Sequence, residues 1–157
     1  MLTKIISGGQ TGADQGFLEG ARRVGIATGG TAPLLYRTEK GVEPDLLKGY
    51  GLLEGKEWGY TARTIQNVKD ADATCWIGTT LYKGGYRTTR DACMNLWGRV
   101  AFNDHWIENP TPEELTRFLS DFKVSVLNGA GNRESGNLGI FQKTVDLVVA
   151  AFGKGDE

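Results

Sequence analysis

The sequence is poor in the residues that bind metals or form disulfides. Its 157 residues include one histidine and two cysteines, and it has no Cys-x-x-Cys pair. Because zinc sites are built mainly from cysteine and histidine, we expect no structural metal. Cys75 and Cys93 are typical of buried thiols in a cytosolic protein. The single histidine, His105, lies between Asp104 and Trp106, which favours a structural or surface role over catalysis.

Long apolar runs and basic clusters are also missing. No run reaches the length of a membrane-spanning helix, and the first residues lack the layout of a signal peptide. The formal net charge is −1, and no lysine- or arginine-rich stripe occurs. We therefore expect a cytoplasmic protein that binds neither a membrane nor nucleic acid. The length favours a single domain, residues 1–157, with a substantial core.

Several motifs that define large enzyme classes do not occur. The glycine-rich stretch Ser7–Asp14 has no lysine after its glycines, so it is not a P-loop. Gly129-x-Gly131 lacks a third glycine and precedes the last predicted helix, so we expect no tight NAD site. A Gly-x-Ser-x-Gly hydrolase motif is absent as well.

Short apolar runs alternate with helical periods along the chain. We predict strands near 3–6, 73–77, 99–102 and 124–127, with a further short strand from Ile26. Helices are predicted between these strands and at the C-terminus, and Thr111-Pro112-Glu113-Glu114 is a strong helix start. This alternation predicts an α/β fold, a Rossmann-like three-layer sandwich with a mostly parallel sheet.

One segment does not fit the alternation. From about residue 30 to 58 the sequence has leucine pairs but no sustained period, which predicts a long irregular loop. Such loops in compact domains are usually functional or interfacial. The alternative is that the segment covers one edge of the sheet.

Three glycine-rich loops follow predicted strands: Gly8–Asp14, Lys83–Asp91 and Asn128–Ser135. The carboxyl ends of parallel strands share one edge of a sheet, so the loops should meet there, with Gly9 and Gly85 in one crevice with Gly131. Free N–H groups at a helix start suit phosphate or another oxyanion. The alternative for the first loop is a tight turn that binds nothing.

These stretches resemble the molybdenum-carrier proteins, a circularly permuted, YpsA-like branch of the SLOG superfamily. The resemblance implies one SLOG-like Rossmann-type domain, oligomeric assembly and a pocket for a nucleotide-like, phosphorylated or oxyanion ligand, with a molybdenum cofactor as one option. The stretches that carry it are Ser7–Asp14, Gly29-Gly30, Arg37-Thr38-Glu39, Tyr60-x-x-Arg63-Thr64-x-x-Asn67-Val68, Asp72-Ala73-Thr74, Gly84-Gly85 and Asn128-x-Ala130-Gly131-x-Arg133-Glu134-Ser135.

The same superfamily includes phosphoribohydrolases, often called lysine-decarboxylase-like, that read Pro-Gly-Gly-x-Gly-Thr-x-x-Glu at the second loop. This chain keeps the paired glycines and Thr88, but Lys83 replaces the proline, Arg87 the third glycine and Asp91 the glutamate. A side chain thus stands where the sugar phosphate would approach, and the carboxylate is one methylene shorter. Both departures disfavour that hydrolysis.

The leading hypothesis is a carrier or sensor that binds a small anionic ligand. Arg133 would supply a charged fork to the anion, with Glu134 orienting it, although the pair could also be a surface salt bridge. The candidate ligand-binding residues are Gly8, Gly9, Gln10, Thr11, Gly12, Asp14, Arg37, Arg63, Gly84, Gly85, Thr88, Asn128, Gly131, Arg133, Glu134 and Ser135.

Two other hypotheses remain open. The first is a nucleoside-monophosphate phosphoribohydrolase that cleaves an N-glycosidic bond, with Asp91 or Glu134 as the catalytic carboxylate. The second is an assembly protein whose long loop is an interface. Whether the protein is an enzyme is therefore undecided at this point.

Aromatic residues suggest a homo-oligomer, a dimer or a tetramer. The chain has four Trp, five Tyr and six Phe. Trp58, Tyr60, Trp97 and Trp106 fall at the edges of predicted elements, where aromatic residues often anchor interfaces. The alternative is that they cap the core of a monomer.

Overall fold

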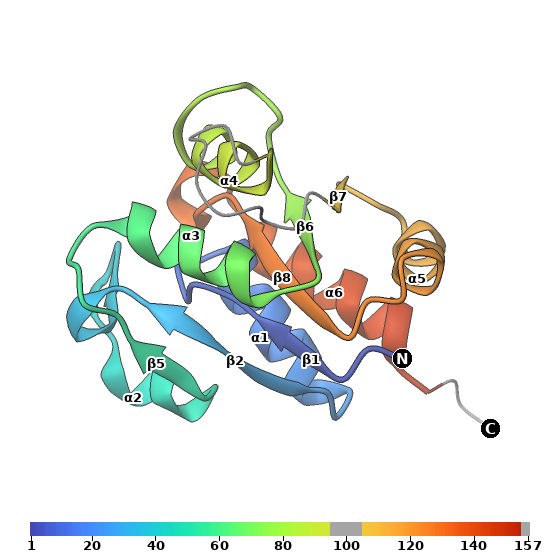
Figure 1. Ribbon diagram of the computed structural model, residues 1–157. Coiled ribbons are helices and arrows are strands. Elements are labelled where there is room, and N and C mark those ends of the chain that lie inside the picture. The colour runs from blue at the N-terminus through green and yellow to red at the C-terminus, as the bar shows by residue number, and fades with distance from the viewer. Residues whose placement is uncertain (95–104, 155–157) are drawn as a thin grey trace.

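A six-stranded parallel sheet forms the middle layer of the computed structural model, which describes residues 1–94 and 105–154 (Figure 1). The strand order is β5-β2-β1-β8-β6-β7, and every neighbouring pair is parallel. The strands are β1 (Lys4–Ile6), β2 (Ala27–Ala32), β5 (Leu52–Glu54), β6 (Ala73–Ile77), β7 (Trp106–Glu108) and β8 (Val126–Gly131).

Helices cover both faces of this sheet (Figure 1). One face carries α1 (Ala13–Arg23), α5 (Pro112–Asp121) and α6 (Ile140–Phe152), whose apolar side chains share one core cluster. The other face carries α3 (Tyr60–Asp70) and α4 (Gly84–Met94), which pack together through a second cluster. The predicted Rossmann-like α/β sandwich with a parallel sheet is therefore confirmed.

The helix start predicted at Thr111 is present in the structure as the beginning of α5. Thr111 Oγ1 accepts a hydrogen bond from the Glu114 backbone at 3.1 Å, and the Glu114 carboxylate accepts one from the Thr111 backbone at 3.3 Å. This reciprocal capping box satisfies two N–H groups that the helix leaves open. Leu115 and Leu119 then lie buried on the face that meets the core.

The segment predicted as one irregular loop is built from short regular elements instead. It contains the end of β2, a 3-10 turn (Leu34–Tyr36), the hairpin β3 (Arg37–Thr38) and β4 (Gly41–Val42), the helix α2 (Pro44–Gly49), and β5. None is long enough to produce a sustained period, which is why the pattern was invisible in the sequence. In each of two leucine pairs one member is buried, namely Leu47 and Leu52.

Other predicted boundaries shifted. The last strand begins at Val126 and continues to Gly131, so Asn128, Gly129 and Gly131 are strand residues rather than loop residues. Gly84 and Gly85 likewise belong to the first turn of α4. The strand predicted near 99–102 lies outside the described residues.

The aromatic residues behind the predicted oligomer lie in different settings. Trp106 stacks on Trp76 at 6.4 Å between ring centroids, and Trp58 is exposed. Trp97 lies outside the described residues, so the assembly state remains a prediction. No helix in the described part of the chain combines the length and apolarity needed to span a membrane.

The order of the strands in the sheet determines where a binding site can form. β8 lies between β1 and β6. The helices that follow β1 and β8, α1 and α6, cover one face, whereas α4, which follows β6, covers the other (Figure 1). The connections from β8 and β6 therefore leave the sheet in opposite directions, and a crevice opens at the carboxyl ends of the strands.

Candidate functional site

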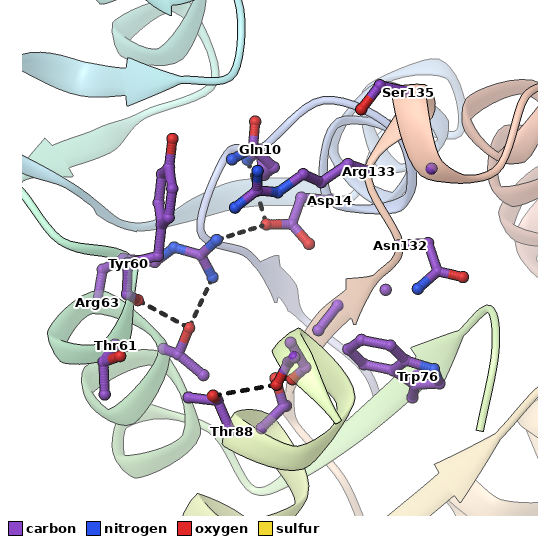
Figure 2. Close-up of a pocket in the computed structure, with 17 residues that line it drawn as sticks. Gln10, Asp14, Tyr60, Thr61, Arg63, Trp76, Thr88, Asn132, Arg133 and Ser135 are labelled. Atoms are coloured by element: carbon purple, nitrogen blue, oxygen red, sulfur yellow. Dashed lines mark hydrogen bonds and ion pairs between the residues drawn. The ribbon is translucent and has the colours of Figure 1, made fainter. Parts of the chain in front are cut away.

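The crevice holds a pocket of about 530 Å³ between the ends of β1, β6 and β8 and the first turns of α3 and α4 (Figure 2). All three predicted loops contribute to it. The residues that line it are Gln10, Asp14, Tyr60, Thr61, Arg63, Thr64, Trp76, Gly84, Gly85, Thr88, Thr89, Ala130, Gly131, Asn132, Arg133, Ser135 and Gly136.

Two arginines lie beside one buried carboxylate. Arg63 from α3 places its guanidinium 3.7 Å from Asp14 Oδ2 and donates to Thr64 Oγ1 at 2.8 Å. Arg133, after β8, extends toward Asp14 from the other side of the pocket (Figure 2). Gly8 makes room for Arg63, because a Cβ there would lie 2.6 Å from the guanidinium. Gly8 therefore supports the site without lining it.

Three guanidinium groups contact the Tyr60 ring. Arg37, Arg63 and Arg133 have their Cζ atoms 4.7, 5.7 and 4.8 Å from its centroid. Arg37 also lies 4.6 Å from the Trp58 ring and donates to the Trp58 carbonyl at 3.2 Å. Cation–π contacts of this kind orient arginines. Arg37 thus adds charge beside the pocket but is not among its lining residues.

Asp14 occupies the start of α1, where the sequence suggested that an anion would bind. The residue is 3 % exposed, and its carboxylate accepts a hydrogen bond from the Gln10 backbone at 3.2 Å. Burial raises the pKa of Asp14 above its usual range, and the charges of Arg63 and Arg133 oppose this rise. The carboxyl is therefore easier to protonate than an exposed aspartate.

The backbone of the first loop is largely used within the protein, contrary to expectation. Thr11 N donates to the Gln10 side chain and Ala13 N to the Asn132 carbonyl. Gly9, with a φ of 82°, faces Leu47 and Leu52 rather than the pocket. Of the three glycines expected in one crevice, only the other two line it.

Thr11 and Gly12 also point away from the pocket. The Thr11 hydroxyl donates to the Glu39 carboxylate, and Gly12 packs against the backbone after β8. Glu39 also accepts from the Ser135 backbone at 3.2 Å and from the Ser135 hydroxyl. Burial tends to raise the pKa of Glu39, but the hydrogen bonds from Ser135 and Thr11 outweigh it, and the pKa is lowered. Glu39 thereby ties the β3–β4 hairpin to the site.

The start of α4 offers open donors. Within the described residues, no acceptor pairs with the backbone N–H groups of Gly84, Gly85 and Tyr86. Gly84 and Gly85 line the pocket beside Thr88, whose hydroxyl donates to the Gly84 carbonyl at 3.2 Å. A helix start with unpaired N–H groups attracts anions. The start of α4 therefore provides the unpaired backbone N–H groups that were expected from the first loop.

Two predicted site residues of the third loop contact other parts of the fold rather than the pocket. Asn128 is buried in the sheet and donates to Thr74 Oγ1 at 3.3 Å. Glu134 does not orient Arg133, because its carboxylate accepts from the backbones of Gly139 at 2.6 Å and Phe141 at 2.9 Å, at the start of α6. Both lie outside the pocket lining.

Asp91, the other candidate catalytic carboxylate, is also engaged elsewhere. It is 7 % exposed, accepts a hydrogen bond from the Tyr82 hydroxyl and lies 3.8 Å from Arg87. The hydrogen bond to Asp91 raises the pKa of Tyr82. Neither Asp91 nor Glu134 lines the pocket, so Asp14 is the one acidic side chain among the described residues that line it.

Sequence reasoning missed several pocket residues. In the sequence, Tyr60 carries the resemblance and is a candidate interface residue, and Thr64 carries the resemblance alone. The i and i+4 spacing nevertheless places both on one face of α3 beside Arg63. Trp76 lies in the buried strand β6, as predicted, and it also lines the pocket, a role that its apolar strand pattern does not indicate. Glu39 belongs to one of the stretches that carry the resemblance but lies outside the pocket lining. Its bonds to Thr11 and Ser135 could not be predicted, because these partners are distant in sequence.

Comparisons with known proteins agree with this architecture. The chain is similar to a solved structure from Syntrophus aciditrophicus SB described as a "putative molybdenum carrier protein", with 32% identity and a TM-score of 0.81. The similarity covers 97% of this chain and 96% of the other. No curated protein matches the chain.

The chain also matches a known protein family over nearly its whole length. The model of the circularly permutated YpsA SLOG family matches residues 5–152. This range includes every strand except the first residue of β1, and all the residues that line the pocket. The chain therefore belongs to the circularly permuted YpsA branch of the SLOG family.

Proposed function

We propose that the protein binds a small anionic ligand in this pocket and acts as a carrier or sensor for it. The observation that carries the proposal is the convergence of Arg63, Arg133 and the open N–H groups of α4 on one pocket with a single acidic side chain among its described lining residues. Such donors suit the oxygens of a phosphorylated, nucleotide-like or oxyanion ligand.

The name of the similar structure suggests molybdenum as one cargo. The lining residues offer N–H and O–H donors and one carboxyl, and none of those described is a cysteine or a histidine. This donor set fits molybdenum as the oxyanion molybdate rather than as a metal cation. Molybdate also has the tetrahedral shape of a phosphate group, so the same donors support both ligand types.

Catalytic cleavage of an N-glycosidic bond has less support. The two carboxylates that could act in it, Asp91 and Glu134, are bound to Tyr82 and to the start of α6. Asp14 is buried between two arginines. We therefore place ligand binding first and propose no reaction.

A thermal-shift series tests the proposal. Molybdate, sulfate, phosphate and adenosine monophosphate are each added to the protein, and at least one should raise the melting temperature. At a hundredfold excess over the dissociation constant the gain is about 2.7 kcal/mol. Arg133→Ala should lose most of this shift, because it removes a charged fork from the pocket.

Arg117→Ala is the matched control, because Arg117 is exposed on α5 and lies outside the pocket. It should keep the full shift. If Arg133→Ala also keeps the full shift, the assignment of Arg133 to the site is wrong. If the unmodified protein responds to no anion, the proposed function itself fails.

A further inference from the structure

The side-chain amide of Gln10 can adopt only one orientation in this pocket. Its Oε1 accepts hydrogen bonds from the Thr11 backbone at 3.0 Å and from the Glu39 backbone at 2.8 Å. Exchanging the amide oxygen and nitrogen would set an NH₂ group against two other donors. The two backbone N–H groups therefore fix Oε1 toward the β3–β4 hairpin and Nε2 away from it.

This orientation leaves a donor without an acceptor. Gln10 is 4 % exposed, and its Nε2 is buried with no hydrogen-bond partner within the described residues. Gln10 lines the pocket, and its amide lies beside the guanidinium of Arg133 (Figure 2). Buried polar groups are almost always paired in folded proteins, so an orphan at a pocket wall indicates a partner that arrives from outside.

A second orphan lies in the same pocket. Arg63 Nε is also buried and has no partner among the described residues. Its neighbouring nitrogens contact Asp14 and Thr64, so the guanidinium is held in place with one N–H still open. The open groups on this side of the pocket are thus donors, which select for acceptor atoms.

We propose that Gln10 Nε2 and Arg63 Nε donate hydrogen bonds to oxygen atoms of the ligand. The inference rests on the proposed function and narrows it: the group bound at this end is an acceptor-only oxyanion group, such as phosphate or molybdate. An ammonium group, which has donors and no acceptor, would meet like donors here. Glu39 takes part as a positioning residue, because its backbone N–H holds Gln10 Oε1.

The Gln10→Glu variant keeps the structural role of Oε1 and removes the proposed ligand-binding role of Nε2. A carboxylate keeps the acceptor for the backbones of Thr11 and Glu39 but loses the donor and adds a negative charge. We expect the melting temperature without ligand to be unchanged or higher. In isothermal titration calorimetry with inorganic phosphate and with molybdate, the dissociation constant should rise by about tenfold or more.

Gln142→Glu is the matched control, because it makes the same change on the exposed side of α6, where Gln142 contacts Asp146. It should leave the dissociation constants unchanged. A dissociation constant for Gln10→Glu equal to that of the unmodified protein would overturn the inference while leaving the proposed function standing. If the unmodified protein binds none of the four anions of the thermal-shift series, the proposed function on which the inference rests fails instead.

A second measurement needs no variant to fold. In ¹⁵N-correlated nuclear magnetic resonance spectra of the unmodified protein, the side-chain NH₂ signals of Gln10 should move when phosphate is added, because a new acceptor pairs with Nε2. The NH₂ signals of Gln142 should stay in place. Gln10 signals that do not move while the Arg63 side-chain signal does would show that Gln10 has a structural role alone.

Discussion

Asp14 is the residue whose ionisation the pocket controls most directly. It is buried, and its pKa is raised above the ordinary value of 3.8. A raised pKa means that the folded state disfavours the ionised form, so the stability of the protein falls as pH rises from 3.8 through the raised pKa. Above that range the cost of the buried charge is fully present.

Asp14→Asn should remove this dependence. The free energy of unfolding of the unmodified protein, relative to the variant, should fall as pH rises through this range and then level off, as measured by urea unfolding at a series of pH values. Phosphate should also bind the variant more tightly, since a negative charge beside the ligand is gone. A difference that does not change with pH would contradict the raised pKa.

At the scale of a single element, Glu134 tests whether a polar side chain beside the pocket binds the ligand or caps a helix. Its carboxylate accepts from two backbone N–H groups at the start of α6. Glu134→Ala should therefore lower the free energy of unfolding by about 1 kcal/mol, measured by urea unfolding. The anion-induced thermal shift should remain, and loss of that shift with unchanged stability would place Glu134 in the site after all.

Many of the helices and strands could be predicted from the sequence. The elements that could not be predicted were missed for physical reasons. Local sequence decides β1, β6 and the start of α5, so these elements were predicted well. The signals were the apolar runs at Ile5-Ile6 and Thr74–Ile77 and the capping box at Thr111. The short elements between 33 and 54 were missed, because their packing on Leu18 decides their structure. The sequence also located the pocket loops but not which of their groups are already paired, as Thr11 and Glu134 show.

At the scale of the whole molecule, the parallel sheet brings segments far apart in sequence into one pocket. Gln10, Arg63 and Arg133 come from the first, middle and last parts of the chain and line it together (Figure 2). We propose that the groups gathered in this pocket bind an oxyanion. A crystal of the protein soaked in molybdate, with anomalous diffraction data collected at the molybdenum edge, tests it most directly. We expect an anomalous peak between Arg63 and Arg133, within hydrogen-bond reach of Gln10 Nε2. Peaks confined to the outer surface, with none in the pocket, would contradict it.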